Sequence, residues 1–194
     1  MLTGEEIIRR VKSGDIIITN FDENKVNPNS YNLTLNKHMI QYALKETIET
    51  YYDSRIKVYP VNGVEYLDCK MPNPTIEYDI PDEGLVLFPG VLYLGSTNEY
   101  TECKDLIPCI DGRSSIGRLG IQIHATAGFG DVGFKGKWTL EITVVHPVKI
   151  YPNMELCQIY FTEPVGTTGI QYKGKYQNQD SAIASKLFSE MKNS

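Results

Sequence analysis

The sequence lacks the closely spaced ligand pairs from which most protein zinc sites are built. Its four cysteines include no C-x-x-C pair, and none of its three histidines belongs to an H-x-E or H-E-x-x-H arrangement. Because a tetrahedral zinc site draws on such spacings, we expect no zinc site. The cysteines are instead predicted to be free, buried thiols in a reducing compartment. They are Cys69, Cys103, Cys109 and Cys157.

Neither an excess of basic residues nor a long apolar run is present. The chain has 19 Lys and Arg against 24 Asp and Glu, a formal net charge of −5. This balance argues against a nucleic-acid polymer as partner. No apolar run approaches the length that crosses a bilayer, and residues 1–6 lack the basic and apolar parts of an export signal. We therefore expect a cytoplasmic protein without a membrane partner.

Turn residues and short apolar alternations are abundant. With 194 residues, 16 Gly and 13 Tyr, the chain is predicted to form one mainly β domain, a barrel or a sandwich. Thr3 and Glu6 form a capping box, Gly14 ends the short helix that follows, and a second helical pattern covers 181–191. The segment 45–80 is irregular and is interpreted as hairpins and loops. Strands are expected at 15–19, 31–35, 85–88, 91–95, 121–124, 138–145, 148–150 and 156–161.

The densest polar segment is 111–118, which reads DGRSSIGR. Glycine lets the backbone approach a ligand closely, while backbone N–H groups, serine hydroxyls and guanidinium groups donate to phosphate oxygens. A helix that started here would add its dipole. Arg113, Ser114, Ser115 and Arg118 are therefore candidate phosphate contacts. The alternative is a solvated turn in which an arginine pairs with a carboxylate.

A glycine-rich segment lies at 126–136, with four glycines in its last nine residues. This spacing predicts a tight hairpin that brings backbone groups against a flat ligand. Asp131 lies inside the segment, where its carboxylate could accept a hydrogen bond from a sugar hydroxyl or polarise a water. In the alternative interpretation, Asp131 is only a turn residue.

The segment 138–145 alternates as a strand. Trp138, Leu140, Ile142 and Val144 share one face, and Thr139, Glu141, Thr143 and Val145 share the other. Glu141 is the only charged residue in it, and a carboxylate between Thr and Val side chains is partly desolvated, which suits proton transfer. The alternative is an outward-facing glutamate without a chemical role.

Near the end of the chain, two lysines and two tyrosines fall within 172–176. Such a segment could close over a polyphosphate, although polar tails without any ligand are also common.

Taken in order, these four segments resemble the dCTP deaminase family, a branch of the trimeric dUTPase-like fold. The resemblance implies a mainly β, dUTPase-like distorted β-barrel with a short N-terminal and a short C-terminal helix. It implies one domain, 1–194, in which 166–194 is a mobile tail that closes over the site. It also implies a homotrimer with active sites between subunits, and Mg²⁺ held on the triphosphate rather than by protein side chains. The supporting motifs are 21–23, 28–33, 111–115 with Arg118, 126–128, Asp131 with 133–134, 140–141, 175–176, 178–179 and 184–185.

The resemblance also implies roles for individual residues. Glu141 matches the general base, which takes a proton from the water that attacks C4 of cytosine. Ser114, Arg118 and the carbonyl of Ala127 match the groups that hold this water and the amino edge of the base. Asp131 matches the residue near the deoxyribose 3′-hydroxyl, and the backbone of Thr139 matches the part of the strand that contacts the pyrimidine ring. The phosphate contacts are matched by Arg113, Ser114 and Ser115. The closing tail is matched by Tyr172, Lys175, Tyr176 and Gln179.

Zinc deaminases carry H-x-E and P-C-x-x-C signatures, which this sequence lacks. We therefore expect water to be activated by a carboxylate, a hydroxyl and a guanidinium group. The resemblance implies dTTP as a feedback inhibitor that acts near 124–125, although His124 is equally consistent with a packed strand residue. Three positions depart from the family pattern: Val132 replaces a proline, Val145 an asparagine and Asn153 a glycine.

The leading functional expectation is the hydrolytic deamination of dCTP to dUTP and ammonia, a step towards dUMP and dTTP. The closest competing hypothesis is a bifunctional enzyme that continues to dUMP and pyrophosphate. Gly128-Phe129 resembles the bifunctional members, whereas many deaminase-only members carry a His-Arg pair there. Two less favoured hypotheses are a dUTPase without deaminase activity and a non-catalytic nucleotide-binding regulator.

Overall fold

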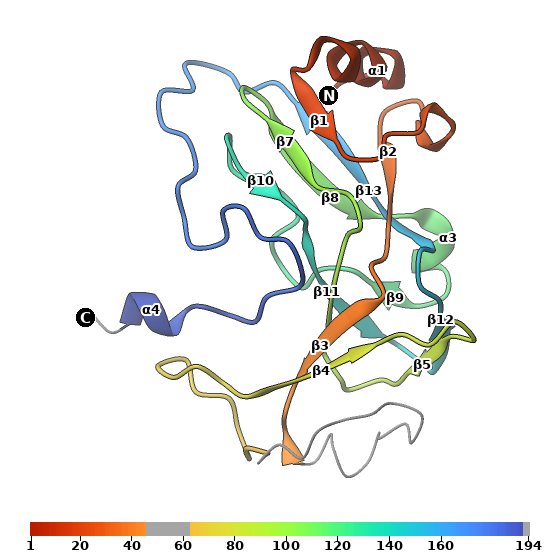
Figure 1. Ribbon diagram of the computed structural model, residues 1–194, viewed down its shortest axis with the longest axis vertical. Helices are drawn as coiled ribbons and strands as arrows, with labels where there is room; N and C mark the ends of the chain where they lie inside the picture. Colours follow the sequence, from red (N-terminus) through yellow and green to blue (C-terminus); the bar gives the residue numbers. More distant parts are fainter. Residues whose placement is uncertain (46–62, 192–194) are drawn as a thin grey trace.

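The computed structural model describes residues 1–45 and 63–191, and its elements are short strands joined by turns (Figure 1). The helices are α1 (Gly4–Ser13), η1 (Glu23–Lys25), α3 (Ser114–Gly117) and α4 (Phe188–Met191). The first strands are β1 (Ile16–Ile18), β2 (Tyr31–Thr34), β3 (His38–Tyr42), β4 (Thr75–Asp79), β5 (Leu85–Leu87), β6 (Tyr93–Ser96) and β7 (Thr101–Cys103). The others are β8 (Ile107–Gly112), β9 (Ile121–Gln122), β10 (Lys135–Gly136), β11 (Thr139–Val144), β12 (Val148–Ile150) and β13 (Glu155–Thr162).

In the described ranges the strands form four antiparallel sheets, in the orders β1-β7-β10, β4-β3-β6-β11-β9, β12-β5 and β2-β13-β8. The prediction of a mainly β chain with short helices is thus confirmed. Within the described residues these sheets do not close into a continuous barrel. No described helix is long and apolar enough to span a membrane.

The inner faces of these sheets share one apolar core. Tyr31, Leu33, Ile142, Leu156 and Phe161 are among its fully buried side chains. They come from β2, β11 and β13, so strands of different sheets pack against one another. The strand that carries Glu141 is therefore fixed by its neighbours on both edges and by the core beneath it.

The N-terminal helix follows its predicted signals. Thr3 is the N-cap and its hydroxyl accepts a hydrogen bond from the N–H of Glu6, while Gly14 ends α1 in the left-handed conformation at φ 81°. An apolar side chain at Ile7 is fully buried, so the capped helix is held on the domain by one face.

Two predictions about local structure were wrong. The glycine-rich segment is a loop that leads into β10, and β10 pairs with β7 rather than closing a hairpin. The helical pattern at 181–191 forms a helix only at Phe188–Met191. Before it, the N–H of Ile183 donates to the Thr139 hydroxyl at 3.2 Å and that of Ser185 to the Tyr42 hydroxyl at 2.9 Å. These tertiary contacts take the backbone donors that a helix would have used.

In the irregular segment, strand β4 was not predicted; it pairs with β3 along its whole length, from Thr75 opposite Tyr42 to Asp79 opposite His38. Residues 63–74 are turns and loops with one isolated bridge, from Val64 to Leu44. The part of the predicted hairpin region at 46–62 lies outside the described residues.

Candidate active site

Strand β11 places Glu141 in the largest sheet, between β6 and the edge strand β9. Leu140, Ile142 and Val144 are buried and Thr139 and Glu141 are partly exposed, which confirms the predicted division into two faces. One carboxylate oxygen of Glu141, Oε2, accepts a hydrogen bond from the N–H of Ala125 at 2.8 Å. This bond fixes the carboxylate at the surface of the sheet and leaves Oε1 turned towards the space beside it, with no partner among the described residues.

The glycine-rich loop is held against the edge of β8 by its backbone. The N–H of Ile110 donates to the carbonyl of Gly128 at 2.6 Å, and the N–H of Gly130 donates to the carbonyl of Pro108 at 2.7 Å. A Cβ at Gly130 would lie 2.5 Å from the indole ring of Trp138. Only glycine permits this close approach, and the approach carries the next residue, Asp131, to the same side of the sheet as Glu141.

The segment 172–185 is packed along this face, and Figure 1 shows the C-terminal part of the described chain passing beside β10 before it reaches α4. The N–H of Asn178 donates to the carbonyl of Lys135 at 2.9 Å, and the N–H of Lys137 donates to the carbonyl of Gln179 at 2.9 Å. Gln177 adds side-chain bonds to the backbone of Gly133 and Lys135. The tail therefore continues the sheet edge and forms a wall opposite Glu141.

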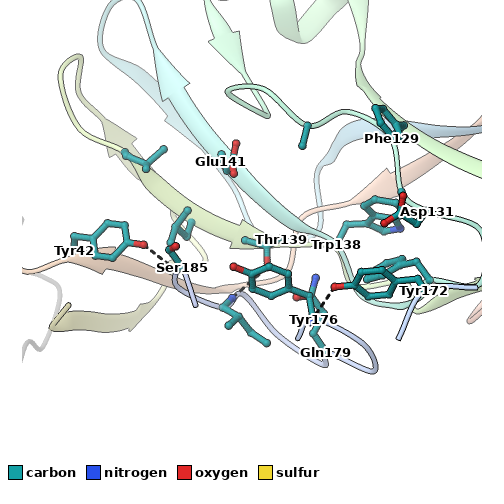
Figure 2. A pocket seen from close by; sticks show the side chains of 16 residues that line it. Tyr42, Phe129, Asp131, Trp138, Thr139, Glu141, Tyr172, Tyr176, Gln179 and Ser185 are labelled. Carbon is teal, nitrogen blue, oxygen red and sulfur yellow. Dashed lines mark hydrogen bonds between the residues drawn. The ribbon is translucent and has the colours of Figure 1, made fainter. Parts of the chain in front are cut away.

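Strand, loop and tail enclose a cavity of about 440 Å³. Figure 2 shows Glu141 and Thr139 on the strand, Asp131 and Trp138 towards one end, and Tyr172, Tyr176 and Gln179 along the tail. Asp131 and Glu141 are the two carboxylates of the lining. A volume of several hundred Å³ with mostly apolar walls and few polar groups is typical of small-molecule sites.

Seven of the predicted site residues line this cavity: Ala127, Asp131, Thr139, Glu141, Tyr172, Tyr176 and Gln179. Lys175 does not line it, because its ammonium group pairs with the carboxylate of Glu190 on α4 and lies 5.4 Å from the ring centroid of Tyr176. The hydrogen bond to Glu190 raises the pKa of Lys175.

The remaining predicted residues lie at α3, away from this cavity. Arg113 and Ser114 line a second cavity of about 450 Å³, while Ser115 and Arg118 are exposed. Figure 1 shows α3 on the opposite side of the molecule from the C-terminal segment. A single chain thus does not bring Ser114 and Arg118 together with Glu141. His124, which is partly exposed, borders the second cavity.

Sequence reasoning assigned no role to several residues that line the first cavity. They are the mostly apolar Tyr42, Leu92, Leu94, Phe134, Trp138 and Ile183, together with Ser185. Trp138 was assigned to the core, and its ring does pack against Phe134 with centroids 4.7 Å apart. The alternation of Leu92 and Leu94 was the one available signal for a second apolar face at β6.

The three departures from the family pattern are accommodated locally. Val132 contributes its carbonyl, which accepts from the N–H of Tyr172 at 2.8 Å, and a proline would offer the same acceptor. Asn153 adopts φ 62°, a conformation that asparagine tolerates better than most residues. Val145 is exposed and follows the end of β11.

Across the described part of the chain, no group of three or more His, Cys, Asp and Glu side chains is placed to hold a metal ion. The four cysteines are free, as predicted; three are buried, but Cys69 is exposed, against the prediction. The carboxylate of Asp131 suits an Mg²⁺ ion carried mainly by phosphate oxygens, since this ion is commonly bound by one or two carboxylates plus substrate phosphates.

Comparison with known proteins decides the family. A family model described as dCTP deaminase-like matches residues 1–163. The chain belongs to this family. A relative from Clostridium beijerinckii, named dCTP deaminase, dUMP-forming, is 46% identical over 190 residues, covering 98% of each chain. Relatives with the same name from Leptospira biflexa and Cytophaga hutchinsonii are 45% and 43% identical over 190 residues, covering 98% of this chain and 97% and 98% of theirs.

The family's fold is also found among solved structures. The 2′-deoxycytidine 5′-triphosphate deaminase from Agrobacterium tumefaciens matches with a TM-score of 0.57 and 18% identity. The match covers 84% of this chain and 47% of that one. At this identity the likeness concerns the fold, which is the dCTP deaminase-type arrangement of short antiparallel strands.

Proposed function

We propose that this chain is a bifunctional enzyme that converts dCTP, with two waters, to dUMP, ammonia and pyrophosphate. The observation that carries the proposal is that Glu141 and Asp131 line one cavity. Two hydrolytic steps at different ends of one nucleotide need two sites of water activation, and this cavity offers one carboxylate for each. The dUMP-forming name of relatives at 43–46% identity supports the same conclusion.

In the first step, Glu141 accepts a proton from a water that attacks C4 of cytosine. The protons are passed to N3 and to the departing amine, so that ammonia leaves and a uracil ring remains. The N–H of Ala125 occupies Oε2 at 2.8 Å, so Oε1 is the oxygen that faces the water. A carboxylate positioned in this way acts as a general base and acid in turn.

In the second step, Asp131 orients a water towards the α-phosphorus, and pyrophosphate leaves. Mg²⁺ bound through the triphosphate would neutralise charge on the phosphate oxygens. Asp131 is exposed at the end of the loop, where the loop carbonyl at Val132 is tied to the tail through Tyr172. The bond between loop and tail thus fixes the backbone beside Asp131.

This proposal replaces dUTP, the leading expectation for the final product, with dUMP. The loop supports the change, because a Cβ at Gly128 would lie 3.2 Å from the His124 ring and 3.2 Å from the carbonyl of Ile110. A histidine at this position, as in deaminase-only members, would displace the His124 ring or the loop. Gly128 and Phe129 therefore belong to a loop path that suits the bifunctional branch.

We further propose that α3 of a second copy completes the site in a homotrimer. Ser114 and Arg118, which the family uses beside the general base, are exposed and lie outside the Glu141 cavity. An adjacent subunit would bring its Arg113, Ser114, Ser115 and Arg118 to the open side of that cavity. In the same arrangement, 166–194 acts as a closing tail. The inhibitor dTTP would be sensed near His124, which borders the cavity of Arg113 and Ser114.

The direct test is to incubate the purified chain with dCTP and Mg²⁺ and to resolve dUTP, dUMP, ammonia and pyrophosphate. The proposal predicts dUMP, ammonia and pyrophosphate in equal amounts. Accumulation of dUTP without pyrophosphate would restore the deaminase-only hypothesis. Hydrolysis of added dUTP with no reaction of dCTP would identify a dUTPase, and binding without turnover a regulator.

A further inference from the structure

A chain of polar side chains connects the N-terminal motif 28–33, to which the function gives no role, with Arg113. The Asn27 amide donates to the Asn32 side-chain oxygen at 2.7 Å, and the Asn32 amide donates to Oε2 of Glu155 at 3.0 Å. The same Oε2 lies 2.9 Å from Nη1 of Arg113, and Nη1 also donates to the backbone carbonyl of Glu155 at 2.9 Å. Glu155 therefore stands between strand β2 and the guanidinium group.

A second branch of the same network reaches the backbone in front of α3. The Ser30 hydroxyl donates to the Gln158 side-chain oxygen at 2.7 Å, and the Gln158 amide donates to the carbonyl of Gly112 at 3.0 Å. Gly112 is the last residue of β8 and precedes Arg113, the N-cap of α3. The two branches thus hold the side chain of Arg113 and the peptide unit that carries it.

The burial of this network changes along its length. Ser30 and Asn32 are 7% and 6% exposed, whereas the side chains of Glu155 and Arg113 are 33% and 32% exposed. Buried polar side chains cost free energy unless they are fully hydrogen-bonded, and such networks hold their members in one arrangement. Here the fixed, buried end orients an arginine at the solvent end, where Arg113 lines the second cavity.

The contacts at Arg113 leave the guanidinium group partly available. Both contacts use Nη1, so Nε and Nη2 have no partner within the described residues. A guanidinium group recognises a phosphate best by presenting two N–H groups in a fixed plane. Holding one corner of the fork to Glu155 sets the direction of the remaining donors.

We propose that Asn32 and Glu155 are positioning residues that orient Arg113 towards the substrate triphosphate. The inference rests on the proposed function, in which Arg113 contacts the phosphates. Neither positioning residue touches the nucleotide. Loss of either weakens triphosphate binding because Arg113 must then be ordered during binding, and the chemistry at C4 is left intact.

The test is a double-mutant cycle on the full-length protein. We measure the Kd of dCTP with Mg²⁺ by calorimetry in a Glu141→Gln background, where dCTP is not turned over, and the steady-state kcat and KM in the active protein. Both are measured for Glu155→Ala, Asn32→Ala, Arg113→Lys and the double variants. Each positioning variant is expected to raise Kd and KM about tenfold with little change in kcat, since misplaced binding groups typically cost one to two orders of magnitude. In the Arg113→Lys background the same substitutions should change Kd less than twofold.

Two controls separate orientation from folding. Glu155→Gln keeps one side-chain acceptor oxygen and should recover most of the affinity. Glu163→Ala removes the carboxylate that pairs with Arg10 at 2.9 Å just beyond the other end of β13, and it should leave Kd unchanged. If a positioning substitution also destabilises the fold, it should lower the thermal midpoint equally in the wild-type and Arg113→Lys backgrounds. Such an effect cancels when the changes in Kd in the two backgrounds are compared.

Additive effects on Kd, or an Arg113→Lys variant that binds dCTP as tightly as wild type, would overturn the inference. Its failure is distinct from failure of the proposed function. A wild-type chain that binds dCTP and releases no product contradicts the function, whereas the binding cycle still decides the role of Asn32 and Glu155.

Discussion

The Glu141 carboxylate accepts a hydrogen bond from the backbone N–H of Ala125 at 2.8 Å. This bond joins the strand that carries the proposed general base to the segment that leads into the glycine-rich loop. Because Ala125 precedes the loop that holds Asp131, the two carboxylates of the cavity are linked through about six residues of backbone. The orientation of the Glu141 carboxylate thus depends on the path of the backbone that leads to Asp131.

Replacing Glu141 by Gln is expected to reduce dCTP deamination by at least about 10²-fold, because the amide cannot accept the proton from water. The side chain keeps its size and its oxygen can still accept from Ala125, so dCTP binding should change less than threefold. Ammonia release and calorimetric binding measure the two effects. Glu77→Gln, an exposed carboxylate on β4, is the matched control. Normal deamination by Glu141→Gln would refute the role of this residue.

A site shared between subunits predicts complementation of two inactive chains. Glu141→Gln and Arg118→Ala are each expected to be inactive alone. When co-expressed, they should form mixed trimers in which one of the three sites combines an intact Arg118 with an intact Glu141, so about one third of wild-type activity should return after the mixed trimers are selected. Purification through two different tags and an ammonia assay measure this. Mixed assemblies with no activity would show that the residues do not share a site.

The sequence was informative where local signals agree with the tertiary contacts. The cap at Thr3, the end at Gly14 and the alternation around Glu141 were all predicted, since capping and burial act within a few residues. Strand β8 was not predicted. It contains Pro108, which is tolerated because β8 is an edge strand in the order β2-β13-β8. The prediction of a helix over 181–187 was wrong. The hydroxyls of Thr139 and Tyr42, which are distant in sequence, accept hydrogen bonds from its backbone N–H groups.

The separation of α3 from the Glu141 cavity was likewise beyond local patterns. The resemblance implied a shared site, but only the folded chain shows which of these residues lie together. Ala127, Asp131, Thr139 and Glu141 lie with the tail residues Tyr172, Tyr176 and Gln179, whereas Arg113 and Ser114 line another face. Hydrophobic periodicity cannot reveal this division, because the division depends on which strands, distant in sequence, pair with one another.

The burial of the cysteines determines which thiol should react and how stability should respond to alkaline pH. Burial raises the pKa of Cys103 to about 12 and also raises that of Cys157, whereas Cys69 is exposed. At pH 8 one thiol, Cys69, should react rapidly with a thiol reagent in the folded protein. Above pH 9 unfolded thiols ionise and folded ones keep their protons, so the free energy of unfolding should fall as pH rises from 9 to 12.

Urea unfolding between pH 8 and pH 10 measures the alkaline response. Cys103→Ala should be less stable at pH 8 because it leaves a small cavity, but its stability should fall less with pH than that of the wild type. Cys69→Ala should retain the wild-type slope. Equal slopes for all three proteins would contradict a raised thiol pKa at position 103.

Chelators test the proposed metal requirement. EDTA in excess should stop dUMP formation, and added Mg²⁺ should restore it, because the triphosphate is expected to carry the ion. A zinc-selective chelator should leave the rate unchanged. Loss of deamination that returns only with Zn²⁺ would show that water activation depends on zinc and not on Glu141 with Ser114 and Arg118.

If one cavity carries out both reactions, the nucleotide passes from the first step to the second without leaving. The most direct measurement is a chase, in which labelled dCTP reacts with Mg²⁺ in the presence of a large excess of unlabelled dUTP. Labelled dUMP is expected to form from the first turnovers, while the pool of free dUTP stays unlabelled. Label that accumulates in free dUTP, with labelled dUMP appearing only after a lag, would contradict this expectation.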